Sequence, residues 1–152
     1  MAYAIRSCSL ENYQQVSEEV TSALPESVSF LQAPLYGRLQ QASGKEVVYV
    51  TITRDSRTVG CGLGVVYEAA AGLRFMYCPY GPVSTVWEAD LVADLETFVR
   101  GIASKLNCTF VRLDANEVNL TSGKKPIPGK LARTASLQPR AEWVLDITPS
   151  ED

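Results

Sequence analysis

The stretch from Leu73 to Thr85 constrains the fold of this chain more than any other. It reads LRFMYCPYGPVST, an apolar strand that runs into a turn with two prolines and a glycine. Proline fixes φ and lacks an amide donor, and glycine adopts conformations that other residues avoid. We therefore predict a rigid loop at the C-terminal end of a strand, presenting the rings of Tyr77 and Tyr80. Ligands often bind at this edge of a sheet, although such a loop can also serve merely to end the strand.

The composition is that of one globular domain with an acidic balance. The chain has 152 residues, of which 46% are hydrophobic and 20% charged, enough for a core and too apolar for a disordered chain. Its formal net charge is -3 and its pI is about 5.0, whereas nucleic-acid binding needs a basic surface. We expect residues 1–152 to form a single domain that does not bind a polyanion by itself.

The absence of histidine excludes several kinds of active site. It removes the Ser-His and Cys-His catalytic pairs and leaves a metal only cysteine and carboxylate ligands. No C-x-x-C pair occurs among the four cysteines, which are Cys8, Cys61, Cys78 and Cys108. We expect buried, reduced thiols, with Cys78 beside the loop as the candidate for reactivity. Neither a metal nor a cofactor is expected.

The N-terminal residues lack the continuous apolar core of a signal peptide. Elsewhere, no apolar run approaches the ~20 residues that a membrane span needs. We therefore expect a cytoplasmic location and no membrane span.

Hydrophobic periodicity predicts six strands and three helices. Alternating or β-branched segments place strands at 3–8, 46–53, 58–67, 73–77, 109–114 and 142–147. Helical spacing, with Ser9 as a cap and Pro25 and Gly44 as terminators, places helices at 10–24, 34–42 and 86–106. We interpret 73–77 as the central strand, 109–114 as a buried strand, 54–57 as a hairpin turn and 115–129 as a polar loop.

Three glycines, Gly60, Gly62 and Gly64, alternate within the strand at 58–67. They indicate a bulge or a face on which another backbone packs closely. A phosphate-binding role is disfavoured, because the glycines lie inside a strand and not at a strand-to-helix turn.

The order of the elements predicts an α+β fold. A hairpin meander followed by a helix that crosses to a further strand is the order of a GNAT-type acyltransferase, with a mostly antiparallel sheet flanked by helices. Enzymes of that type hold the acyl-CoA pyrophosphate with R/Q-x-x-G-x-G/A after the central strand. Here the junction reads YCPYGPVST, whose prolines lack the amide donors of a phosphate nest. This argues against an ordinary CoA-dependent acetyltransferase.

Four pieces of the chain, in order, resemble the Fem family (FemX, FemA, FemB), the peptidoglycan-bridge aminoacyltransferases. The similarity runs from about Phe30 to the end of the chain, and its most specific part is Gln-Pro-Arg followed by Val-Leu-Asp. The matching pieces are Phe30-Leu31-Gln32 with Tyr36-Gly37-Arg38; Tyr77 with Gly81-Pro82-Val83; Val111-Arg112-Leu113-Asp114; and Leu137-Gln138-Pro139-Arg140 with Val144-Leu145-Asp146-Ile147.

The resemblance implies a function and a site. The family transfers an amino acid from aminoacyl-tRNA to the stem-peptide amine of a peptidoglycan precursor, a UDP-linked muropeptide or lipid II. It uses a pair of GNAT-like subdomains, of which this chain resembles the first. A cation near the precursor diphosphate is expected, because guanidinium pairs well with phosphate oxygens. The substrate-binding residues that the resemblance implies are Tyr36, Arg38, Tyr77, Tyr80, Gly81 and Thr85.

Two departures from the family pattern bear on this interpretation. The family has an acid shortly after Gly-Pro-Val, where this chain has Ser84-Thr85. The family chain also continues into a basic segment and a second subdomain, through which aminoacyl-tRNA would be bound, so this chain is expected to be inactive alone. Asp114 and Asp146, which end strands, are interpreted as structural hydrogen-bond acceptors, and the catalytic residues stay unassigned.

Three functions from different classes remain open. The first is the precursor-binding half of a Fem-type aminoacyltransferase. The second is a non-catalytic GNAT-like docking module, for which a homodimer would give the exposed edge and apolar patches a partner. The third is a CoA-dependent N-acetyltransferase with a divergent loop.

Overall fold

The computed structural model describes residues 3–25 and 28–115. The predicted strand at 142–147 and residues 116–129 of the predicted loop lie outside this part of the chain. In order, the elements are β1 (Tyr3–Cys8), α1 (Leu10–Ala23), η1 (Phe30–Gln32), α2 (Pro34–Ala42), β2 (Val47–Arg54), β3 (Arg57–Glu68), η2 (Ala70–Gly72), β4 (Arg74–Cys78), β5 (Val83–Ser84), α3 (Ala89–Lys105) and β6 (Phe110–Leu113).

The strands form one mixed sheet in the order β1-β2-β3-β4-β6, with β5 paired to β3. All neighbours are antiparallel except β4 and β6, which run parallel. The predicted α+β architecture with a mostly antiparallel sheet is therefore observed. The central strand, however, is β3, and the interpretation of 73–77 as the centre was wrong. The 12-residue β3 pairs with β2 along most of its length and then with both β4 and β5 on its other side.

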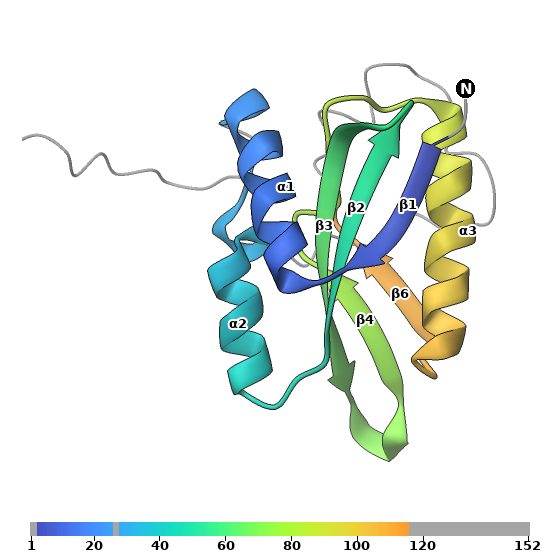
Figure 1. Ribbon diagram of the computed structural model, residues 1–152. Helices are drawn as coiled ribbons and strands as arrows, with labels where there is room; N and C mark the ends of the chain where they lie inside the picture. Colours follow the sequence, from blue (N-terminus) through green and yellow to red (C-terminus); the bar gives the residue numbers. More distant parts are fainter. Residues whose placement is uncertain (1–2, 26–27, 116–152) are drawn as a thin grey trace, which may run out of the picture.

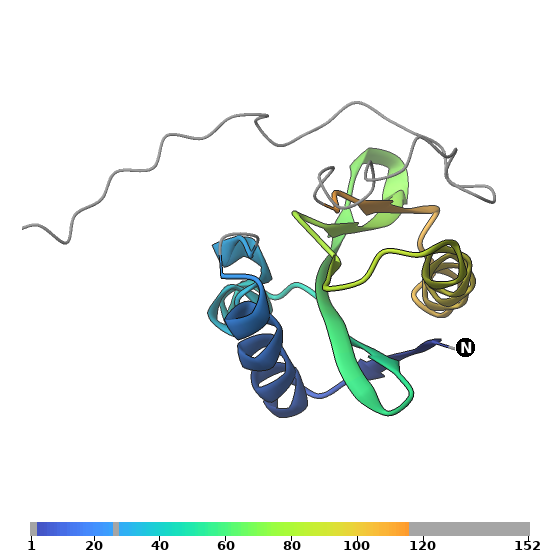
Figure 2. The same cartoon turned by 90° about the horizontal axis from the view of Figure 1, so that it is seen from above.

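Helices cover both faces of the sheet. Figures 1 and 2 show α1 and α2 on one face and α3 on the other. The core beneath α1 is built around Tyr13, Tyr49 and Leu63. The core beneath α3 joins Val48, Val50, Val66 and Met76 to the helix through Phe98 and Ile102. The C-terminal end of β4 therefore lies between the layer formed by α1 and α2 and the layer formed by α3.

The long helix α3 buries the predicted stripe but begins three residues later than predicted. Leu91, Leu95 and Val99 are buried against the sheet. The delay has a local cause, because the Ser84 hydroxyl donates to the Val86 carbonyl at 2.7 Å and accepts from the Val86 amide at 3.2 Å. These two bonds hold the chain in a turn before the helix begins.

The alternating glycines of β3 lie where other chain segments approach closely. A Cβ at Gly62 would lie 3.1 Å from Pro82, and one at Gly64 would lie 2.9 Å from the sulfur of Met76. Gly60 faces the backbone of β5, and the register of β2 against β3 shifts beside it, between Ile52 and Thr53. Both expected roles, close packing and a bulge, are thus found in the same strand.

The last strand of the described sheet, β6, is less buried than predicted. Phe110 is 45% exposed, because β6 lies at one end of the strand order and the face carrying Phe110 points away from α3. In the part of the chain that the structure describes, no helix is long and apolar enough to cross a membrane.

The connection between β3 and β4 holds Ala71 in a left-handed conformation, with φ 61° and ψ 24°. Such a conformation costs an L-residue about 1–2 kcal/mol, and glycine, which tolerates it, costs about 0.5–1 kcal/mol in chain entropy. We expect Ala71→Gly to raise the free energy of unfolding by about 0.5–1 kcal/mol in urea denaturation. The matched control is Ala69→Gly at an extended residue, φ -101°, which should lower stability. Equal effects of the two variants would contradict this account.

Candidate functional site

The candidate site lies at the C-terminal ends of the two parallel strands, β4 and β6. Their register pairs Tyr77 with Arg112 and Cys78 with Leu113, and the Asp114 amide donates to the Cys78 carbonyl at 3.1 Å. Paired residues on neighbouring strands point to the same face. The Arg112 guanidinium accordingly lies 5.9 Å from the centre of the Tyr77 ring.

A half-buried carboxylate joins these two side chains. The Tyr77 hydroxyl donates to Asp114 Oδ2 at 2.6 Å, and Arg112 Nη2 lies 3.3 Å from Asp114 Oδ1. The side chains of Arg112 and Asp114 are 12% and 14% exposed, so solvent screens this ion pair less than a surface pair. Asp114 is the hydrogen-bond acceptor that the sequence indicated.

Gln32 joins the layer of α1 and α2 to β3 and to the loop after β4. Its side chain is fully buried, donates from Nε2 to the carbonyls of Leu63 at 3.1 Å and Pro79 at 2.6 Å, and accepts from the Leu63 amide at 2.8 Å. The backbone carbonyl of Gln32 accepts a hydrogen bond from the Tyr13 hydroxyl at 2.8 Å. Sequence reasoning missed this role, although a lone amide in an otherwise apolar segment was the available signal.

The loop after β4 is packed closely around that amide. Pro79 and Gly81 are buried, and a Cβ at Gly81 would lie 2.7 Å from the Gln32 amide and 2.8 Å from the Cys78 sulfur. The Gly81–Pro82 peptide bond is cis, and Tyr80 has a left-handed backbone with φ 51°. A bulky non-glycine residue rarely adopts that conformation, and such residues cluster at functional sites.

The expectation that Cys78 is reactive was wrong. Cys78 is buried, and burial raises the pKa of its thiol to about 12. Burial likewise raises the pKa of Cys61 to about 11. All four cysteines are free thiols. Because the thiolate is the nucleophile, the two buried cysteines are inert.

Tyr36 connects α2 to the site through a row of aromatic rings. Burial and a hydrogen bond to Tyr36 raise the pKa of Tyr67 to about 12. The Tyr67 ring stacks on Phe75 at a centroid distance of 5.5 Å, and Phe75 stacks on Phe110 at 5.0 Å. The row crosses β3, β4 and β6 on the face that Tyr77 and Arg112 share.

Arg38 and Thr85 lie away from the β4 loop. Arg38 is exposed on the α1 side of α2, where Nη2 donates to Gln14 Oε1 at 3.4 Å. The Thr85 amide donates to the Val59 carbonyl at 2.8 Å, whereas Tyr77 pairs with Val65 of the same strand. Six residues of a strand span about 20 Å. The structure therefore places Tyr77, Tyr80 and Gly81 together at the C-terminal end of β4. Tyr36 lies at the α2 end of the aromatic row.

The junction between β4 and α3 offers little to an anion. Glu88 caps α3 without a side-chain capping bond and Asp90 lies in its first turn. The Glu88 carboxylate accepts from the Tyr3 hydroxyl at 3.0 Å and pairs with Arg54 at 3.0 Å. A helix N-terminus attracts anions through its free amides and dipole. Here two acidic side chains already occupy that end of the helix.

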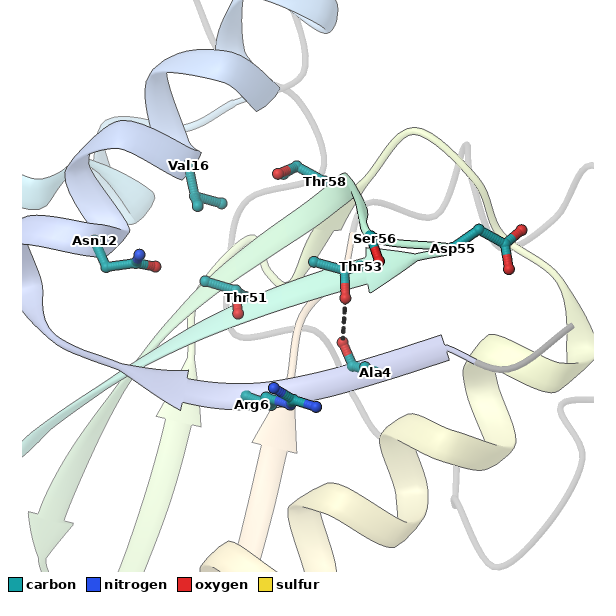
Figure 3. Close-up of a pocket in the computed structure, with 9 residues that line it drawn as sticks. All are labelled: Ala4, Arg6, Asn12, Val16, Thr51, Thr53, Asp55, Ser56 and Thr58. Atoms are coloured by element: carbon teal, nitrogen blue, oxygen red, sulfur yellow. Dashed lines mark hydrogen bonds between the residues drawn. The ribbon is translucent and has the colours of Figure 1, made fainter.

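Two hollows lie outside this cluster. One, of about 600 Å³, is an open polar hollow over β1, β2 and β3 (Figure 3), where the Thr53 hydroxyl donates to the Ala4 carbonyl at 3.3 Å. None of the predicted site residues borders it. The other is a groove of about 820 Å³ between α1 and α2, bordered by Arg38, Phe30 and Leu35 among others. Among residues 3–25 and 28–115, no group of three or more acidic, cysteine or histidine side chains is placed to hold a metal ion.

Comparison with solved structures establishes the class of fold. The ribosomal-protein-alanine N-acetyltransferase of Brucella melitensis biovar Abortus 2308 superposes with a TM-score of 0.58 and 11% identity, over 88% of this chain and 100% of that one. A Trypanosoma brucei acetyltransferase gives 0.54 and 17%, over 90% and 99%. Glucosamine-6-phosphate N-acetyltransferase of Arabidopsis thaliana gives 0.53 and 13%, over 90% and 98%.

At these identities the likeness shows the fold alone. This chain has the fold of the GNAT acetyltransferases. No family model and no curated protein sequence matches the chain.

The Gln32 amide gives a prediction about stability. In Gln32→Ala three buried backbone groups, at Leu63 and Pro79, lose their partner, and each unsatisfied group costs about 1–3 kcal/mol. We expect the free energy of unfolding to fall by at least about 3 kcal/mol in urea denaturation. The matched control, Gln14→Ala on the exposed surface of α1, should change it by less than about 0.5 kcal/mol. If Gln32→Ala lowered the free energy of unfolding by less than about 1 kcal/mol, the stabilising role given to the Gln32 amide would be wrong.

The buried thiols give a prediction about pH. With a pKa of about 12, Cys78 is a thiolate in roughly one molecule in ten thousand at pH 8. Iodoacetamide should therefore label Cys78 and Cys61 much more slowly than Cys8 in the folded protein, and all four alike in denaturant. Peptide mass spectrometry reads this out, and rapid labelling of native Cys78 would contradict it.

The same thiols link stability to alkaline pH. Folding raises the pKa of Cys61 and Cys78 above the ordinary value of 9.0. The stability that this linkage contributes is fully present below about pH 9 and is lost as pH rises through the folded values.

Proposed function

We propose that this chain is the precursor-binding half of a Fem-type aminoacyltransferase. Such an enzyme transfers an amino acid from aminoacyl-tRNA to the stem-peptide amine of a UDP-linked muropeptide or lipid II. The proposal starts from the GNAT-type acyltransferase fold. Its finer part rests on the sequence resemblance and on the chemistry of the junction between β4 and α3.

That junction is the observation that carries the proposal. Pro79 and Pro82 have no amide donor, and Gly81 is packed against the Gln32 side chain. The adjacent helix begins with Glu88 and Asp90, whose charges oppose a bound phosphate. A CoA pyrophosphate would meet prolines without amide donors in the loop and two acidic side chains at the start of the helix. An acyl donor held outside this junction, as aminoacyl-tRNA would be by the second half of the enzyme, is compatible with these features.

The pair formed by Tyr77 and Asp114 suits an amine acceptor. A carboxylate attracts N–H donors, and the contacts of Asp114 with Tyr77 and Arg112 hold its carboxylate in one orientation. In the proposed reaction the amine nitrogen attacks the ester carbonyl, the new amide bond forms, and the ester C–O bond breaks. The amine proton passes to the leaving hydroxyl of the tRNA. Orientation and oxyanion stabilisation supply the rate, without a covalent enzyme intermediate.

The remaining predicted residues would line an extended ligand. Tyr80 in the loop after β4 would contact such a ligand, with the buried Gly81 setting the course of that loop, and Arg38 on α2 would meet the precursor diphosphate. Thr85 lies about 20 Å from Tyr77 along β3, so it would touch only a long ligand such as a peptide-bearing precursor. The tRNA is assigned to the second half of the enzyme, so turnover by this chain alone is not expected.

A divergent CoA-dependent N-acetyltransferase is the second candidate. It is favoured by the structural neighbours, which include a predicted acetyltransferase from Clostridium acetobutylicum solved with acetyl-CoA, TM-score 0.53 at 10% identity. The two candidates differ in the ligand that the isolated chain binds.

Calorimetric titration of the chain with UDP-MurNAc-pentapeptide tests the proposal. We expect saturable binding that Arg38→Ala weakens roughly tenfold to a hundredfold, the effect of losing a charge-assisted contact. The matched control is Arg57→Ala in the exposed β2–β3 turn, which should leave the affinity unchanged.

A parallel thermal-shift measurement with acetyl-CoA separates the candidates. The proposal expects no shift. A clear shift with acetyl-CoA and a flat titration with the muropeptide would overturn the proposal in favour of the acetyltransferase.

A further inference from the structure

The sheet face beneath α1 changes from apolar to polar along its strands. Cys8 of β1, Tyr49 of β2 and Leu63 of β3 belong to the apolar core beneath α1. Side chains two residues apart on a strand point to the same face of the sheet. Arg6 therefore lies on the face of Cys8, and Thr51 lies on the face of Tyr49. The next position along each of these strands is thus polar.

Pairing between the strands gathers the polar residues into one place. The register sets Arg6 opposite Thr51, Ala4 opposite Thr53, and Thr53 opposite Thr58. The three threonines are half-buried, and a β-branched side chain has few rotamers. The Thr53 hydroxyl also donates to the Ala4 carbonyl at 3.3 Å. Three neighbouring strands therefore present a group of oriented hydroxyls beside one guanidinium.

These residues border the open hollow of about 600 Å³ that Figure 3 shows. Asn12 and Val16 of α1 lie on one side of it, and the turn at Asp55 and Ser56 lies at its end. Both turn residues have left-handed backbones, with φ 49° and 65°, as a tight two-residue hairpin turn requires. The borders of the hollow are thus set by a helix, three strands and a tight turn.

The charges around the hollow suit a ligand with a single negative group. Arg6 is the one cation among the lining residues, and Asp55 is the one anion. In the described part of the chain Arg6 has no ion-pair partner, whereas Arg54 and Arg74 each pair with a glutamate. A planar guanidinium can bind a carboxylate through two parallel hydrogen bonds. The charge of Asp55 opposes any further negative charge on the ligand.

The uncharged lining indicates the rest of the ligand. None of the nine lining residues is aromatic, so the hollow offers no ring on which a nucleobase could stack. Hydroxyl groups both donate and accept hydrogen bonds, and they match the hydroxyl groups of a ligand in either role. The volume lies within the range of about 300–1,000 Å³ that is usual for small-molecule sites.

We propose that this hollow binds a small hydroxylated carboxylic acid of the sugar-acid class. The carboxylate pairs with the Arg6 guanidinium, and the hydroxyl groups of the ligand exchange hydrogen bonds with Thr51, Thr53 and Thr58. Because the hollow is open and Arg6 is exposed, we expect weak binding, with a dissociation constant of about 1 mM.

An NMR titration of the full chain with sodium gluconate tests this proposal. Gluconate carries one carboxylate on a hydroxylated chain, sorbitol carries the hydroxyl groups without the charge, and acetate carries the charge without the hydroxyl groups. We expect saturable shifts in the amide signals around the hollow with gluconate, and none around Tyr77. Sorbitol and acetate should each bind at least about tenfold more weakly.

Two variants separate the charged contact from the hydroxyl contacts. Arg6→Gln should weaken gluconate binding at least about tenfold. Thr51→Val keeps the shape of the side chain, and it should weaken gluconate binding about threefold to tenfold without changing the affinity for acetate. The matched control is Lys105→Gln, which removes an exposed cation on α3 and should bind gluconate like the wild type. Thermal unfolding checks that each variant is folded.

Three results would overturn the proposal. They are the absence of saturable shifts up to about 50 mM gluconate, equal affinities of the wild type and Arg6→Gln, and tighter binding of inorganic phosphate than of gluconate. Equal affinities for gluconate and acetate would overturn the assignment to a hydroxylated acid. The muropeptide titration is a separate test, because Arg38 borders a different groove and none of its predicted contacts lines this hollow.

Discussion

The architecture around the site depends on one buried amide. Gln32 contacts Leu63 as a neighbouring strand would, giving one bond to its carbonyl and accepting one from its amide. The second donor of the same amide holds Pro79, the first residue of the loop after β4. Beyond Tyr77, β4 separates from β3, which pairs next with β5. The amide thus satisfies backbone groups at the point where the sheet divides, and it couples the α1–α2 layer to the loop.

The division of the sheet arranges the chemistry of the site. On one side, β4 continues beside β6 and brings Tyr77, Arg112 and Asp114 into contact. Beyond the loop, β5 continues along β3 in the same direction as β4, toward Val59 and the start of α3. In the proposed function, an acceptor amine and an acyl donor would approach different parts of the molecule. The polar cluster at the strand ends suits the former, and the acidic beginning of α3 limits the latter.

Local patterns were sufficient to predict β1 to β4, β6 and the three α-helices, and less informative about their arrangement. Alternation in β2 and β3 and the stripe of α3 were read correctly, because each depends on residues a few positions apart. The middle position of β3 was not, since it depends on pairing between strands that are distant in the sequence, with β6 joining the sheet beyond β4. Gln32 acts on groups 31 and 47 residues away, and Glu88 joins Tyr3 to Arg54 across three elements. The lone amide in an apolar segment could signal a buried polar side chain at Gln32, but the partners of these contacts could not be predicted, because they lie far away in the sequence.

The carboxylate of Glu88 acts as a counter-ion that the chain supplies to its own helix. Fixed beside the first turn of α3 by Tyr3 and Arg54, it neutralises the positive end of the helix without any bound anion. Under the proposed function, a fold shared with the GNAT acetyltransferases would serve a different class of acyl donor with its strands and helices unchanged. Charge at one helix end and proline at two loop positions would be enough to alter the preference. Relatives that differ in donor should then diverge most at these few positions and least in the sheet.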